Sequence, residues 1–275
     1  MKISEIIAKL REFHPQIDEE KTCDIVKYGD PEQECTGIVT CCFASSDVLR
    51  KTAELGANFV ITHEPLFWTH EDETDWLADS AIFAAKKKLL DDAGIVVWRD
   101  HDHIHGGKPS NNPPAIDGIY YGIMKELGWD EYKLDYPNKP LVFQFPERDA
   151  TDLGLELKEK LNLNGIRIVG DPHARVSRVF FCEHIKDHDW KEKEKIHKAD
   201  AEGIDAVIPL EMIDWSLAAF VRDSCQLGRP RIMYNVGHFN FEELGMKYME
   251  QYLPQIVGDV PVHYIQSGDS FNFIL

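Results

Sequence analysis

The sequence lacks the features that mark exported and membrane proteins. No run of about eighteen apolar residues is present, and Glu5, Lys9, Arg11 and Glu12 interrupt the N-terminus where a signal peptide would have its apolar core. The six cysteines show no CxxC spacing and lie mostly in hydrophobic surroundings, as buried free thiols do. We therefore expect a cytoplasmic protein that spans no membrane.

The chain has fewer basic residues than acidic residues. Lys and Arg number 30 against 48 Asp and Glu, and the formal net charge of −18 repels phosphate backbones and anionic membranes. We expect neither a nucleic-acid partner nor a membrane partner. The 275 residues, of which 43% are hydrophobic, suffice for about two domains with real cores.

Apolar runs alternate with helical segments in the first part of the chain, which indicates an α/β fold. TGIVTCCFA, SSDVLRKTAELG and NFVIT predict a strand, a helix and a strand without a hairpin turn, so the strands should be parallel neighbours. A helix over residues 80–93, with Ser80 as its N-cap, leads to the strand IVVW. A helix from about residue 115 to 127 follows the polar loop GGKPSNNPP.

The pattern changes at about residue 131. LVFQFP, TDLGLELKEKLNL and IRIVG predict a strand, a helix and a strand. We expect a small inserted α+β subdomain at 131–178 and a metal-binding core made of 1–130 and 179–275. In the second part of the core, SRVFFCEH and DAVIP are strands on either side of a charged helical segment.

A short internal repeat relates the two parts of the core. ELGANFVITHEP at 54–65 aligns with AEGIDAVIPLEM at 201–212, a constant offset of 147 that pairs Glu64 with Glu211. The following strands pair His101 with His238. Chance similarity is the alternative, but a duplicated βαβ unit would place these strand ends on one sheet edge, where α/β proteins bind ligands. We predict two pseudo-repeated βαβ halves that form a core around a metal site.

Potential metal ligands follow three of the predicted strands. They are His63 and Glu64 after FVIT, His101 and His105 after IVVW, and His238 and Glu242 after IMYNV. A spacing of four residues puts two side chains on one face of a helical turn. Because the set contains no thiolate, it suits a catalytic zinc, iron, manganese or cobalt ion better than a structural zinc.

Each pair also has a structural interpretation. His63 and Glu64 suit a helix start after a strand, and the tract 101–105 suits a solvated polar loop. His238 suits a turn followed by a capping residue, with Glu242 on a solvated helix face. Three histidines within five residues at the end of a buried strand nevertheless favour metal binding.

Four further polar residues stand near the predicted ligands or have a ligand-type spacing. Glu211 is our candidate general base, although a carboxylate at a helix start is the alternative. Lys108 is a candidate for binding a substrate anion, with plain solvation as the alternative. His184 and His188 have the spacing of a ligand pair, but their Lys/Glu-rich segment is typical of a solvated face.

Three motifs together resemble those of a known family. ITHEPLFW is similar to ITHHPLIF, RDHDHIH to HTNLD, and VGHFNFEE to GHYxSE of the dinuclear metal center hexameric protein family, which contains the NGG-interacting-factor-like proteins. The resemblance covers roughly 1–128 and 179–275. It implies an α/β core with a variable inserted domain, two metal ions between the halves, and hexameric rings in several members. Members are often named GTP cyclohydrolase type 2 homologs.

The resemblance carries the family's metal ligands onto His63, Glu64, His101, His105 and the pair His238 and Glu242. Two residues depart from the family pattern, because Glu64 replaces a histidine and His105 replaces an aspartate that usually bridges the metals. Imidazole offers one lone pair to one ion, whereas a carboxylate can span two. We therefore expect Glu64 or Glu242 to take the bridging role, with a mononuclear site as the alternative.

These observations predict a metal-dependent hydrolase, resembling GTP cyclohydrolase type 2 homologs, that acts on a small polar or nucleotide-like substrate. The alternatives are a non-catalytic metal-binding, sensing or regulatory protein, and a scaffold that uses its acidic surface. The resemblance also implies a homo-oligomer, specifically a hexamer. The hydrophobic C-terminus SFNFIL suits either an edge strand or an interface.

Overall fold

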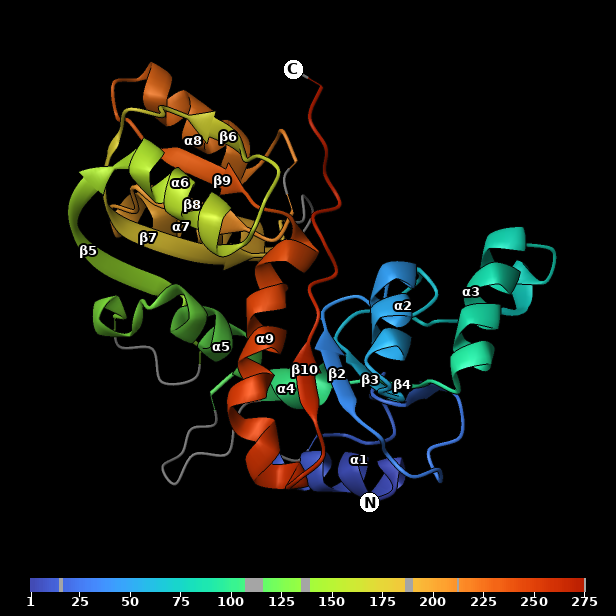
Figure 1. Cartoon of the computed structure of the whole chain (residues 1–275). Helices are drawn as coiled ribbons and strands as arrows, with labels where there is room; N and C mark the ends of the chain where they lie inside the picture. The colour runs from blue at the N-terminus through green and yellow to red at the C-terminus, as the bar shows by residue number, and fades with distance from the viewer. Residues whose placement is uncertain (15–16, 107–115, 135–138, 186–189, 212, 275) are drawn as a thin grey trace. The chain divides into compact units, whose positions relative to one another are not determined.

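The structure is a computed structural model of the whole chain (Figure 1), and it describes residues 1–14, 17–106, 116–134, 139–185, 190–211 and 213–274. The chain divides into two compact units. Unit 1 contains Met1–Ile123 and Glu242–Ser267, and unit 2 contains Met124–Phe241 and Gly268–Leu275. Each unit is built on a five-stranded sheet with helices packed on it. The predicted α/β fold with two repeated halves is therefore confirmed. The expectation that the equivalent strand ends of both halves share one sheet edge is wrong, because β3 and β4 belong to one sheet and β8 and β9 to the other.

The sheet of unit 1 has the strand order β1-β4-β3-β2-β10. Strands β10, β2, β3 and β4 are parallel, and only the edge strand β1 runs antiparallel to its neighbour β4. The strands are β1 (Val26–Tyr28), β2 (Ile38–Cys41), β3 (Phe59–Thr62), β4 (Val96–Arg99) and β10 (Val262–Tyr264). The helical elements are α1 (Ile3–Phe13), α2 (Ser46–Glu54), η1 (Asp75–Leu77), α3 (Ala81–Ala93) and α4 (Asp102–Gly106).

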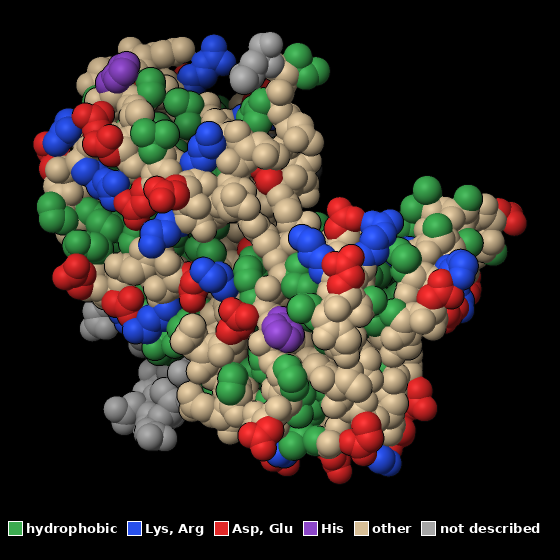
Figure 2. Space-filling view, in the orientation of Figure 1, with side chains coloured by type: hydrophobic (Ala, Val, Ile, Leu, Met, Phe, Trp, Pro, Cys, Tyr) green, Lys and Arg blue, Asp and Glu red, His purple; other side chains and the backbone are tan. Residues whose placement is uncertain are grey.

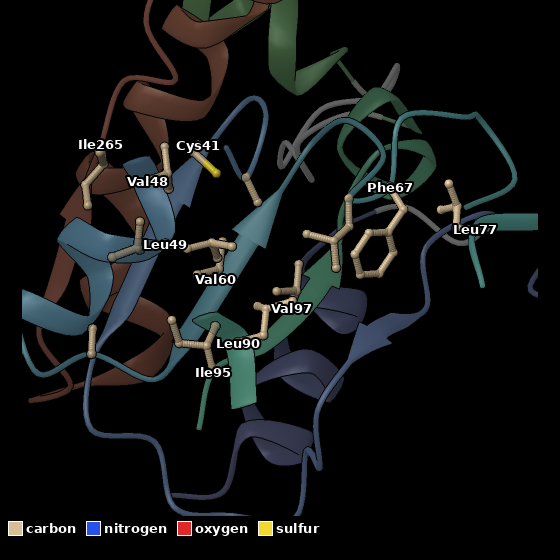
Figure 3. Close-up of a cluster of buried hydrophobic side chains, with 14 residues drawn as sticks. Cys41, Val48, Leu49, Val60, Phe67, Leu77, Leu90, Ile95, Val97 and Ile265 are labelled. Carbon is tan, nitrogen blue, oxygen red and sulfur yellow. The ribbon is translucent and has the colours of Figure 1, made fainter. Parts of the chain in front are cut away.

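The core of unit 1 lies between the sheet and helices α2 and α3 (Figure 3). Val39, Val60 and Val97 come from β2, β3 and β4 at corresponding positions, and Leu49 of α2 and Leu90 of α3 pack against them. All of them are at most 1% exposed. The β-branched runs thus form strands that are buried on both faces, as expected for a parallel sheet.

Serine caps fix the starts of the two helices over this core. The Ser45 side chain accepts a hydrogen bond from the backbone N–H of Val48, and Ser80 accepts one from Phe83. Gly94 ends α3 in the left-handed conformation with φ of 60°, which glycine adopts without steric cost. The predicted role of Ser80 as N-cap is confirmed.

The sheet of unit 2 has the order β5-β7-β8-β9-β6. Strands β7, β8 and β9 are parallel, and the edge strands β5 and β6 are antiparallel to β7 and β9. The strands are β5 (Val142–Asp149), β6 (Arg167–Gly170), β7 (Arg175–Glu183), β8 (Ala206–Pro209) and β9 (Ile232–Asn235). The helical elements are η2 (Asp130–Tyr132), α6 (Ala150–Lys160), α7 (Trp190–Ala201) and α8 (Leu217–Gln226).

Two helices contain residues of both units. They are α5 (Gly118–Leu127) and α9 (His238–Val257). The described residues of 131–178, which we expected to form an inserted subdomain, supply β5, α6 and β6, and both strands join the sheet of unit 2. In the C-terminal SFNFIL, residues 270–274 form no strand, contrary to one expectation. Instead, the backbone carbonyl of Phe271 accepts a hydrogen bond from the side chain of Asn164.

The six cysteines are all free thiols. Within the described part of the chain, no helix has the length and apolar character that crossing a bilayer requires. Figure 2 shows acidic and basic side chains interspersed over the visible face of the protein.

Candidate metal centre

The carboxyl ends of β3 and β4 bring the predicted ligands of unit 1 together. Thr62 of β3 is in register with Arg99 of β4, so His63 and His101 follow neighbouring strands at the same sheet edge. His105 lies one turn further along the short helix α4. The potential ligand atoms of these three histidines all lie within 4.8 Å of one another.

Hydrogen bonds determine which ring nitrogen of each histidine is available to a metal. Nδ1 of His63 lies 3.0 Å from the backbone carbonyl of Asp100, which can only accept, so this nitrogen carries the proton. Nδ1 of His101 lies 2.9 Å from the Asp102 carboxylate, and Nδ1 of His105 lies 2.9 Å from that of Asp117. In the neutral form of each of these imidazoles the lone pair is therefore on Nε2, the arrangement found in carboxylate-histidine-metal triads.

Two carboxylates complete this group of side chains. Oε2 of Glu242, on the first turns of α9, lies 3.3 Å from Nε2 of His63, and both side chains are almost fully buried. Glu64 offers an oxygen within 4.8 Å of both residues. The next residue, Glu243, fixes α9 to the sheet edge, because its carboxylate accepts hydrogen bonds from the backbone N–H groups of Cys42 and Ser267.

The two carboxylates differ in their surroundings. Glu64 faces the guanidinium of Arg99, which is 0% exposed and lies 3.6 Å away. The same Arg99 donates hydrogen bonds to the backbone carbonyls of His63 and His70. A buried cation beside Glu64 offsets the negative charge that this residue adds at a position where the family pattern has histidine.

Burial and charge set opposite protonation preferences for two neighbouring histidines. Burial alone would lower the pKa of His63, but the charge and hydrogen bond of Glu242 outweigh it and raise the pKa to about 9. Burial lowers the pKa of His101 to about 4, with the nearby His63 and His105 acting in the same direction. A cation among these residues would replace the proton on His63 and find His101 already neutral.

The middle histidine of the tract, His103, has a structural contact instead. It is 0% exposed, and Asp24 and Glu19 accept hydrogen bonds from its Nδ1 and Nε2 at 2.7 and 2.9 Å. Asp24 also accepts from the backbone N–H groups of His101, Asp102 and His103 at 2.8, 3.0 and 2.7 Å. Asp24 therefore fixes the start of α4 and the spacing of the two histidines on either side of His103.

The remaining predicted site residues lie in unit 2 or outside the described residues. Glu211 follows β8, and its Oε1 lies 2.7 Å from Nδ1 of His184 and 3.1 Å from Nδ1 of His238. Burial alone would raise the pKa of Glu211, but the hydrogen bonds from His184 and His238 lower it to about 2. Lys108, the expected contact for a substrate anion, and His188 lie outside the described residues.

Comparison with known proteins identifies the family. The profile of Duf34/NIF3 (NGG1p interacting factor 3) matches residues 1–269. The chain belongs to the Duf34/NIF3 family. The predicted resemblance is thereby confirmed.

Several solved structures share the fold of this chain at low sequence identity. The Staphylococcus aureus protein SA1388 is 16% identical with a TM-score of 0.70, and the match covers 100% of this chain and 99% of that one. A Bacillus cereus protein related to NIF3 is 14% identical with a TM-score of 0.69 over 100% and 99%. Reduced HcgD from Methanocaldococcus jannaschii is 18% identical with a TM-score of 0.63 over 96% and 97%. No curated protein sequence matches this Duf34/NIF3 chain.

Several residues of the centre were not found by reading the sequence. Asp102 and Asp117, which orient His101 and His105, were passed over, although Asp102 stands directly beside its histidine. Arg99 was predicted only to be the first residue of the histidine-rich tract that follows the strand IVVW. His184 was assigned to a solvated face, but the structure places it against Glu211. A carboxylate next to a predicted ligand histidine was the one local signal available.

Proposed function

We propose that the histidine and glutamate cluster of unit 1 binds divalent metal and that the protein is a metal-dependent hydrolase for a small polar or nucleotide-like substrate. The observation that carries the proposal is that hydrogen bonds hold the proton of each neutral imidazole on Nδ1 and direct its Nε2 lone pair to a metal, in a largely buried group with two carboxylates. The set of three imidazoles and two carboxylates, without thiolate, suits Zn²⁺, Fe²⁺, Mn²⁺ or Co²⁺.

We propose His63, His101 and His105 as the nitrogen ligands and Glu242 as the carboxylate that bridges when two ions are present. His105 has a single available lone pair, so it cannot perform the bridging role of the aspartate it replaces. Glu242 is favoured over Glu64 for this role, because Arg99 already faces Glu64 at 3.6 Å. A single-ion centre is the other form that this ligand set allows.

When bound, divalent ions lower the pKa of coordinated water towards neutrality and polarise the bond that is attacked. The protein's own contribution is to hold its ligands in fixed orientations. The backbone carbonyl of Asp100 and the side chains of Asp102 and Asp117 fix the imidazole rings, and Asp24 fixes the start of the helix that carries His105. This rigidity limits the reorganisation that metal binding and catalysis require.

Three further properties are proposed on the family resemblance and the sequence together. These are a GTP cyclohydrolase-like hydrolytic reaction, assembly into homohexamers, and a cytoplasmic location. The free state of all six cysteines agrees with a reducing compartment.

The experiment measures the number of metal ions per chain by elemental analysis. The protein is first treated with a chelator and then loaded with Zn²⁺, Mn²⁺, Fe²⁺ or Co²⁺. We expect His101→Asn and Glu242→Gln to lower the metal content, and the exposed control substitutions His197→Asn and Glu54→Gln to leave it unchanged. Unchanged metal content in both site variants would contradict the proposed centre.

Catalysis is tested separately by screening the loaded protein against nucleotides, cyclic amides and phosphoesters for release of phosphate, ammonia or formate. We expect turnover that requires metal and that His101→Asn abolishes. Tight metal binding without turnover on any of these compounds would favour a sensing or regulatory metal-binding protein instead.

A further inference from the structure

The segment between β3 and η1 carries an exposed histidine next to the centre of unit 1. The ring centroid of His70 lies 6.1 Å from that of His101, and the two rings meet edge to face at 84°. The side chain of His70 is exposed, whereas that of His63 is buried. The groups of candidate metal ligands among the described residues do not include His70. It therefore stands beside the centre without being one of its ligands.

Buried groups fix the backbone on which His70 lies. Nη1 of Arg99, a residue that is 0% exposed, donates a hydrogen bond to the backbone carbonyl of His70 at 2.6 Å. Asp72 accepts a hydrogen bond from the backbone N–H of Leu66 at 3.0 Å and lies 3.9 Å from Nζ of Lys27. The side chains of this ion pair are at most 5% exposed. His70 thus combines a fixed backbone with a side chain that small molecules can reach.

Arg99 also determines which nitrogen of His70 can donate a hydrogen bond. Nη2 of Arg99 lies 3.4 Å from Nδ1 of His70, and a guanidinium can only donate. The neutral imidazole therefore accepts at Nδ1 and carries its proton on Nε2. The arrangement is the reverse of that in His63, His101 and His105, whose Nδ1 atoms face oxygen acceptors. His70 offers an N–H donor where its neighbours, in their neutral form, offer lone pairs.

The same guanidinium strengthens this donor towards anions. A hydrogen bond accepted at Nδ1 polarises the ring, which makes Nε2–H of His70 a stronger donor. The positive charge of Arg99 behind the ring favours an acceptor that carries negative charge over a neutral one. The chemistry of this position therefore suits an oxyanion.

We propose that Nε2–H of His70 donates a hydrogen bond to an anionic phosphoryl oxygen of a substrate bound at the metal centre of unit 1. The inference rests on the proposed function and names a substrate class for it, namely small phosphorylated molecules. A phosphoryl group has enough terminal oxygens to bind metal and to accept from His70 at the same time. His70 would in this way supply the anion contact for which Lys108 was the candidate in the sequence.

The test is calorimetric titration of the full chain with inorganic phosphate. The protein is treated with a chelator, loaded with Zn²⁺ and freed of excess metal, and its zinc is counted by elemental analysis. We expect His70→Asn to bind phosphate at least about tenfold more weakly than the wild type, at the same zinc content. Asparagine can still accept from Arg99 but has no donor at the position of Nε2, whereas His70→Gln places an amide N–H there and should retain binding. The exposed control substitution His173→Asn should bind phosphate as the wild type does.

The zinc content separates failure of this inference from failure of the proposed centre. Equal phosphate affinity of zinc-loaded His70→Asn and wild type would overturn the role of His70 and leave the centre standing, as would zinc-loaded wild type that binds no phosphate. Loss of zinc from His70→Asn would show a role in holding the centre instead, and a wild type without zinc would overturn both proposals. Long-range ¹H–¹⁵N spectra of the metal-free protein test the tautomer separately: we expect the proton of His70 on Nε2, and a proton on Nδ1 would contradict the inference.

Discussion

Replacing Asp24 by asparagine tests how α4 is fixed beneath the histidines of unit 1. The Asp24 side chain is 0% exposed. Its Oδ1 accepts from the N–H groups of His101 and Asp102, and its Oδ2 accepts from the N–H and Nδ1 of His103. Burial would raise the pKa of Asp24, but the His103 side chain and these N–H groups lower it well below its usual range.

Asparagine keeps one accepting oxygen and places an NH₂ group where the other was. The two bonds to His103 are lost, and buried donors then face one another. Hydrogen bonds to a charged group contribute roughly 1.5–3 kcal/mol each, so the loss of two predicts about 3–6 kcal/mol of destabilisation. That is a large part of the roughly 5–15 kcal/mol that stabilises a typical domain.

The assay is equilibrium urea unfolding of chelator-treated protein, so that metal binding does not contribute to the free energy. The exposed substitution Asp79→Asn is the control and should change the free energy of unfolding by less than about 0.5 kcal/mol. A loss below about 1 kcal/mol for Asp24→Asn would refute the assigned role of this carboxylate.

Three further predictions concern other parts of unit 1. Burial lowers the pKa of Lys86 from 10.5 to about 8, so the folded state binds fewer protons than the unfolded state between these values. The stability of the wild type relative to Lys86→Met should therefore rise by about 3 kcal/mol from pH 8 to pH 10.5 in urea unfolding, and a flat difference would contradict the burial of the charge. A Cβ on Gly245 would lie 2.8 Å from Cα of Ile119, so Gly245→Ala should cost about 1–3 kcal/mol by the same assay; no change would mean that α5 and α9 separate readily. Asp117→Asn should weaken metal binding about 10–100-fold in competition with a chromophoric chelator, whereas unaltered affinity would show that Asp117 does not orient His105.

The central parallel strands could be predicted from the sequence because each carries a local signal. The runs IVT, FVIT and VVW are β-branched and apolar. The short internal repeat, whose two copies are offset by 147 residues, matches β3 at 59–62 with β8 at 206–209. The strands β1 and β10 were not predicted, since each has three half-buried residues without such a run. The pairing of β5 and β6 with β7 and β9 is a long-range choice that no local pattern reveals.

Among the site residues too, those with a local signal could be predicted from the sequence, and those that depend on long-range contacts could not. His63 and His101 could be placed at one sheet edge because His63 directly follows a predicted strand and His101 comes three residues after the next one. The contacts of Asp24 with α4 join residues almost eighty positions apart, and the partner of Glu64 is an arginine on the neighbouring strand. Such pairings depend on the tertiary fold, so no residue spacing in the sequence reveals them.

The most direct test of the proposed centre is anomalous diffraction at the absorption edge of the bound metal, on crystals loaded with Zn²⁺ or Mn²⁺. We predict a peak about 2.0–2.2 Å from Nε2 of His63, His101 and His105, with an oxygen of Glu242 in the same coordination shell. A metal bound through Nδ1 of these histidines, or no peak in unit 1, would contradict the account.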